Sequence, residues 1–155
     1  MNTRRLYLLV ALAAVSASLA LMAATESSPP PKPPLASGVF EWNALKVQPT
    51  RVGARRDVFD APTATLASLE CHITTVNPGE APHAAHRHPD EEMLVIKEGT
   101  VDVTINGVTR PAGPGAVVFF GSNDLHGLRN TGSTPATYYV LRFVPRDLNR
   151  PVAGR

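Results

Sequence analysis

The sequence predicts an all-β fold, a sandwich or barrel of short antiparallel strands. Residues 65–146 alternate between apolar and polar side chains with a period of two, which is the pattern of a strand with one buried face. Turn residues interrupt this pattern at short intervals, and no stretch after residue 40 shows a sustained helical period. The chain has 155 residues, with 15 prolines and 11 glycines, which suits one turn-rich domain and argues against a helical bundle.

The expected strands follow one another closely. The first clear strand runs over residues 65–76 and ends at the turn Asn77-Pro78-Gly79. Residues 101–105 form another strand, and Asn106-Gly107 after it predicts a tight hairpin because both residues tolerate positive φ. The remaining strands are expected over residues 93–96, from 108 onwards, over 116–120 and over 137–144.

The N-terminus predicts an export signal over residues 1–24. Arg4 and Arg5 precede an uncharged apolar run of 19 residues from Leu6 to Ala24, with small residues at its end. The arginine pair is similar to a twin-arginine signal, and an uncleaved membrane anchor is the alternative. We expect the protein to be periplasmic or extracellular, with no membrane span after cleavage. A proline-rich linker (25–37), an arm (38–63) that packs on the barrel or on a neighbouring subunit, the barrel (64–146) and a tail (147–155) complete the chain.

Charge and cysteine content exclude two classes of function. The net charge is +2, from 15 basic and 13 acidic residues. Removal of residues 1–24, which hold two arginines and no acidic residue, leaves 13 of each and a net charge of zero. No basic surface is therefore expected for nucleic acid. The single cysteine, Cys71, excludes an internal disulfide and a multi-cysteine zinc site.

The stretch His86-Arg-His-Pro-Asp-Glu-Glu92 carries the main functional signal. On a strand, His86 and His88 would project to the same face, and a turn at Pro89-Asp90 could bring Glu92 back beside them. His126 follows after two or three further strands. Three imidazoles and one carboxylate suit a divalent transition metal such as Fe, Mn, Ni, Cu or Zn. Four protein ligands on an octahedral ion would leave two positions for water, dioxygen or a chelating substrate.

These residues resemble the two motifs of the cupin superfamily, in particular a single-domain, cupin-2-like protein. The first motif corresponds to Gly79, His86, His88, Glu92 and Gly99, and the second to Gly115, Gly121, Asn123, His126 and Asn130. The resemblance covers residues 64–145. Two departures stand out: one extra residue separates Gly79 from His86, and Gly121-Ser122-Asn123 replaces a Pro-x-Gly turn. Asparagine accepts the left-handed conformation, so Asn123 can preserve that turn.

The resemblance implies a small jelly-roll β-barrel, also called a double-stranded β-helix, and a homodimer. It also implies His86, His88, Glu92 and His126 as ligands of one metal ion, and dioxygenases, decarboxylases and isomerases occur among cupins with such a ligand set. We expect a dioxygenase-like or decarboxylase- or isomerase-like enzyme for a small enolisable or anionic substrate. Glu92 would stay a ligand or detach to act as a base. The alternative is a non-enzymatic module that binds a small molecule or a metal.

Several other residues are candidates for lining the substrate cavity. Tyr138 and Arg142 share one face of the last strand, and the sequence does not fix which face looks inward. Only one of Phe119 and Phe120 can point inward, and we assign Phe119. His72 shares a face with Glu70 and Thr74, so we expect it on the surface, and Arg55 is expected to be a solvated charge. Asn130 is expected to hold the turn after His126.

Overall fold

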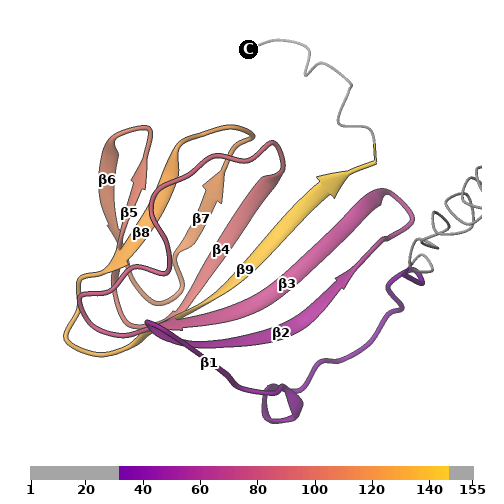
Figure 1. The fold of residues 1–155 in the computed structure, drawn as a ribbon, viewed down its shortest axis with the longest axis horizontal. Helices are drawn as coiled ribbons and strands as arrows, with labels where there is room; N and C mark the ends of the chain where they lie inside the picture. The colour runs from indigo at the N-terminus through magenta and orange to yellow at the C-terminus, as the bar shows by residue number, and fades with distance from the viewer. Residues whose placement is uncertain (1–31, 147–155) are drawn as a thin grey trace, which may run out of the picture. The chain divides into compact units, whose positions relative to one another are not determined.

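The computed structural model describes residues 32–146, which form two antiparallel β-sheets (Figure 1). The larger sheet has the strand order β1-β2-β3-β9-β4-β7, and the smaller sheet has the order β6-β5-β8. A short 3₁₀ helix, Trp42–Ala44, precedes them. The strands are β1 (Gln48–Thr50), β2 (Gly53–Ala61), β3 (Leu66–Val76), β4 (Glu91–Glu98), β5 (Val101–Ile105), β6 (Val108–Ala112), β7 (Val117–Phe120), β8 (His126–Asn130) and β9 (Ala136–Pro145).

The core lies between the two sheets. The larger sheet contributes Leu94, Ile96 and Val140, and the smaller sheet contributes Val103 and Leu128, all of them buried. Because side chains alternate along each strand, the neighbouring residues of β3 and β9 face either this interior or the opposite side of the sheet. The fold is therefore the expected all-β jelly roll, with one layer of apolar side chains packed between two sheets.

The expected strands are present as β3, β4, β5, β6, β7 and β9, and the boundaries of the arm differ from the prediction. Residues 48–61 were assigned to the arm, yet they form β1 and β2, and β2 pairs with β3 over most of its length. Only residues up to 47 remain as an arm, which packs on this chain's own sheet. The Trp42 ring lies 4.5 Å from the Arg56 guanidinium and 4.5 Å from the Lys97 ammonium group, on strands β2 and β4.

Two turns follow the sequence prediction. Asn106 and Gly107 have φ values of 49° and 86°, as a tight hairpin between β5 and β6 requires. Asn123 has a φ value of 61°, so asparagine does supply the left-handed turn before β8.

The export signal, the linker as far as Pro31 and the tail 147–155 lie outside the described residues. Within residues 32–146, no helix is long and apolar enough to cross a membrane.

Candidate metal centre

Two segments far apart in the sequence meet to form a histidine triad, which we define as His86, His88 and His126. The β3–β4 loop runs alongside β8 (Figure 1), and a pair of main-chain hydrogen bonds joins His86 to His126, each with an N···O distance of 3.0 Å. His86 and His88 thus lie on a loop rather than on the expected strand, with one residue in a β-bridge. The ring centroids of the triad lie 4.7 to 5.3 Å apart, and one ligand atom from each lies within 4.8 Å of the others.

Main-chain carbonyls fix the tautomer of two of these rings. The Nδ1 atom of His88 lies 2.8 Å from the Asp90 carbonyl oxygen, and that of His126 lies 2.9 Å from the Asp124 carbonyl oxygen. A carbonyl only accepts hydrogen bonds, so each neutral ring carries its proton on Nδ1 and a lone pair on Nε2. Both Nε2 atoms are buried and have no hydrogen-bond partner among the described residues. A buried lone pair without a partner costs free energy, and a bound metal would satisfy it.

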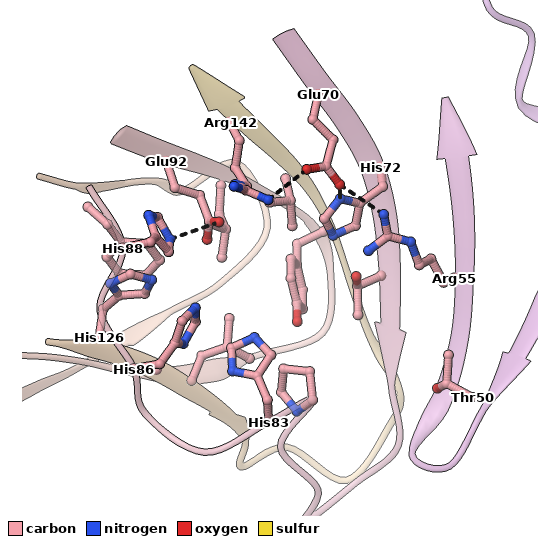
Figure 2. Close-up of a pocket in the computed structure, with 18 of the residues that line it drawn as sticks. Thr50, Arg55, Glu70, His72, His83, His86, His88, Glu92, His126 and Arg142 are labelled. Atoms are coloured by element: carbon pink, nitrogen blue, oxygen red, sulfur yellow. Dashed lines mark hydrogen bonds and ion pairs between the residues drawn. The ribbon is translucent and has the colours of Figure 1, made fainter. Parts of the chain in front are cut away.

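Glu92 lies beside the triad, near the start of strand β4. Its Oε2 atom is 3.6 Å from the His88 Nε2 atom, which is too long for a hydrogen bond (Figure 2). Two ligands that each lie about 2.1 Å from one ion are at most about 4.2 Å apart, so this spacing suits two ligands of a shared ion. The structure therefore brings His86, His88 and His126 into one group, and the fourth residue that the sequence singled out, Glu92, lies beside His88.

The lowered pKa values of two histidines favour metal binding by the triad. Burial lowers the pKa of both His86 and His126, and the neighbouring imidazoles add to this effect. Both rings therefore stay neutral, as ligands must, at a pH where a free histidine begins to charge. Burial raises the pKa of the Glu92 carboxyl, while the nearby His88 and Arg142 side chains act against this shift.

Phe120, and not Phe119, supports the triad. The Phe120 ring stacks on the His126 ring, with centroids 4.1 Å apart and planes inclined by 14°. Phe120 is 1% exposed and lines the cavity, whereas Phe119 is 51% exposed on the other face of β7. The assignment of Phe119 to the cavity is thus corrected to its neighbour. Strand alternation permits only one of the two to point inward, and the sequence does not say which.

The triad and Glu92 line one end of a cavity of about 520 Å³ (Figure 2). Tyr138 and Arg142 line it as well, so the inward face of β9 is the one that carries these two candidates. Tyr138 is buried, which raises the pKa of its phenol and keeps it protonated. Gly79, Gly99 and Gly115 all adopt positive φ in the turns around the barrel. Asn130 holds the loop after β8 through two hydrogen bonds, to Thr134 and from Gly132, and it donates a third to the carbonyl of Val76 at the end of β3.

Sequence reasoning missed three residues on the opposite wall of this cavity. Glu70, His72 and Arg55 line it, and His72 is only 9% exposed, although a surface position was expected. The polar face of β3 points into the cavity. The apolar face, with Cys71 and Ile73, is buried on the other side of the sheet. The alternation along β3 is present in the sequence, but it did not predict that the polar face is covered as well as the apolar face.

Comparison with known proteins agrees with this architecture. A family model described as a cupin domain matches residues 72–142. An RmlC-like cupin from Shewanella frigidimarina is 18% identical, with a TM-score of 0.58 over 72% of this chain and 95% of that one. A predicted oxalate decarboxylase from Thermotoga maritima is 17% identical, with a TM-score of 0.56 over 69% of this chain and 99% of that one. The polyketide cyclase RemF from Streptomyces resistomycificus is 19% identical, with a TM-score of 0.57 over 70% of this chain and 80% of that one. The comparison with curated proteins returns no match.

The two sheets, the histidine loop and the matched family model define a small β-barrel protein with a candidate metal site in its interior. The cupin domain model covers residues 72–142, and the described residues carry one cupin fold. The solved structures differ in what their names describe, and at these identities they establish the fold alone.

Proposed function

We propose that this protein is a metal-dependent enzyme that holds one divalent transition metal through His86, His88 and His126, with Glu92 as fourth ligand or as a base. One observation carries the proposal: the Nε2 atoms of His88 and His126 are buried, have no hydrogen-bond partner among the described residues, and lie together in the cavity. A metal bound there would act as a Lewis acid toward a carbonyl or enolate oxygen. The cavity volume supports a small substrate, of the enolisable or anionic class.

The role of the protein's own residues follows from their partners. Asp90 and Asp124 orient two imidazoles through main-chain carbonyls, and Phe120 fixes the plane of the His126 ring. Glu92 lies beside His88, and burial raises the pKa of its carboxyl, so it takes up a proton more readily than a free carboxylate does.

Metal content tests the proposal directly. We expect purified wild-type protein to retain close to one transition metal ion per chain by elemental analysis. The variants His88→Ala and His126→Ala are expected to lose it. His83→Ala is the matched control, because His83 lies edge-on to His86 at 4.5 Å between centroids but stands outside the triad. Unchanged metal content in both triad variants would reject the assignment.

Turnover separates an enzyme from a binding module. The protein would be reconstituted with each candidate metal and offered enediols, diketones, flavonols and oxo-acids, with oxygen uptake and product formation as readouts. An enzyme is expected to turn over at least one of these classes. Saturable binding of a ligand without turnover in any class would favour the binding module instead.

The proposal includes export and self-association. The leader over residues 1–24 supports export to the periplasm or beyond, and the N-terminal sequence of the mature protein in a fractionated host tests it. Val117 and Phe119 are 63% and 51% exposed on the edge strand β7, and such an apolar strip supports a homodimer. Light scattering of wild type and of Phe119→Ser would report the change in mass.

A further inference from the structure

Glu70 and His72 form a second polar group in the same cavity, away from the histidine triad. Both residues belong to β3, and both project from its inward face because they are two apart. The His72 Nδ1 atom lies 2.9 Å from the Glu70 Oε1 atom (Figure 2). The metal site makes no use of this pair.

Two arginines hold the Glu70 carboxylate in place. Arg142 donates from Nη1 to Oε2 across 3.0 Å, and Arg55 donates from Nη2 to Oε1 across 2.9 Å. Both guanidinium groups donate to this carboxylate, and a carboxylate accepts hydrogen bonds, so the third one comes from His72. The proton of the neutral His72 ring therefore sits on Nδ1, and its Nε2 atom keeps a lone pair.

The free nitrogen of His72 faces the cavity. In Figure 2 the ring edge away from Glu70 is turned toward the interior, and Nε2 has no hydrogen-bond partner within residues 32–146. Burial and the positive charge of Arg55 lower the pKa of His72, although the carboxylates of Glu70 and Asp57 act against this. The ring is thus neutral near pH 7 and able to accept a proton.

We propose that His72 is a proton acceptor for a carbon acid bound in the cavity, with Glu70 as its positioning residue. In this step a C–H bond next to a carbonyl breaks, and its electron pair forms the C=C bond of an enolate. The proton passes to His72 Nε2, giving an imidazolium ion beside the Glu70 carboxylate. Return of the proton to the same carbon restores the carbonyl compound, with inversion when it arrives on the opposite face. In an α-hydroxycarbonyl compound, delivery to the neighbouring carbon, with the hydroxyl proton passing to the former carbonyl oxygen, completes an isomerisation, and no oxidant is needed. The inference rests on the proposed function, since the carbonyl must be held toward the triad.

Proton exchange in D₂O tests this step. The full-length protein, loaded with Mn²⁺ and separately with Zn²⁺, would be incubated with dihydroxyacetone or with pyruvate. Mass spectrometry of the recovered probe would measure deuterium uptake at carbon. We expect wild type to exchange. The exchange rate should fall about 100-fold or more in His72→Gln, and by a smaller factor in Glu70→Gln. Glu91→Gln, on the exposed side of β4, is the matched control and should exchange like wild type.

A second readout does not depend on metal or substrate. Nitrogen-15 NMR of the metal-free protein should show His72 protonated on Nδ1 and not on Nε2, with that preference weakened in Glu70→Gln. A proton on Nε2 in wild type would overturn the proposal. So would equal exchange in wild type and His72→Gln, or no exchange of either probe by metal-loaded wild type. Failure of the metal proposal is distinguishable, because it appears as absent metal in the elemental analysis of wild type.

Discussion

Arg142 donates from Nε to Asp90 Oδ2 across 2.7 Å, and the Asp90 main-chain carbonyl in turn holds the ring of His88. Strand β9 therefore determines how His88, on the β3–β4 loop, is oriented. Asp90 is buried, so this contact lies in a region where water competes poorly for its hydrogen bonds. Arg142 also binds Glu70, and it thereby connects the two polar ends of the cavity.

The first prediction concerns this support of His88. Arg142→Gln removes the bond to Asp90 and should lower metal affinity about 10-fold to 100-fold, as loss of an outer partner of a ligand typically does. Competition with a chelator of known affinity would measure it. Arg129→Gln changes an exposed arginine of β8 and should leave affinity unchanged. Equal affinity in Arg142→Gln and wild type would show that His88 needs no such support.

The second prediction uses two adjacent phenylalanines. Phe120→Ala empties a buried site against His126 and should lower the free energy of unfolding by about 3–5 kcal/mol. Phe119→Ala alters the same residue type one position away, half-exposed, and should cost within about 0.5 kcal/mol. Urea denaturation of the metal-free proteins measures both. Similar losses in the two variants would contradict the assignment of Phe120 to the interior.

The barrel and part of the candidate site could be predicted from the sequence because both rest on local patterns. Alternation predicted β3, β5 and β9, an apolar run predicted β7, and the spacing of His86, His88 and Glu92 predicted one part of the candidate site. Each of these features depends on residues close together in the chain, whereas His126 was assigned through the resemblance to the cupin motifs. The signal of the local features therefore survives without any knowledge of the tertiary structure.

What the sequence did not predict depends on which surface covers each strand face. Alternation in β3 suggested that Cys71 and Ile73 lie inside and that His72 faces solvent, yet both faces are buried. Arg55 was expected in water and instead binds Glu70, because residues 53–61 pair with β3 rather than forming an arm. Each of these outcomes follows from a long-range pairing that no single segment specifies.

The third prediction compares two glycines with positive φ. At Gly99, with φ of 75°, a Cβ atom would lie 2.6 Å from the Ala136 Cα atom and 2.8 Å from the Pro135 oxygen. At Gly107, with φ of 86°, nothing lies within 4 Å of such an atom. Gly99→Ala should therefore be clearly less stable than Gly107→Ala, which carries only the strain of the left-handed conformation, about 1–2 kcal/mol. Thermal melting of both variants would check this. Equal decreases in melting temperature would contradict the prediction.

The fourth prediction is that the metal-free protein loses stability as the pH falls below the ordinary histidine pKa. His72, His86 and His126 all have pKa values lowered from 6.5 in the folded protein, first of all by burial. The unfolded chain takes up protons at these groups near pH 6.5, while the folded protein takes them up only at lower pH. Protons therefore favour the unfolded state in that window, and the stability present above pH 6.5 is lost as the pH falls through the lowered values.

This loss is separable from the titration of carboxylates. Asp57, Asp60 and Asp90 have pKa values lowered from 3.8, so their contribution disappears only in more acidic solution. Urea denaturation in the presence of a chelator, at about pH 7.5 and about pH 5.5, measures the histidine window, in which the raised pKa of Glu92 acts in the opposite direction. We expect a lower free energy of unfolding at the lower pH, and a smaller decrease in His72→Gln because one of the three histidines no longer titrates. Equal or greater stability at the lower pH would mean that these imidazoles are protonated as readily in the folded protein as in the unfolded chain. Burial would then not keep His86 and His126 neutral for metal binding at that pH.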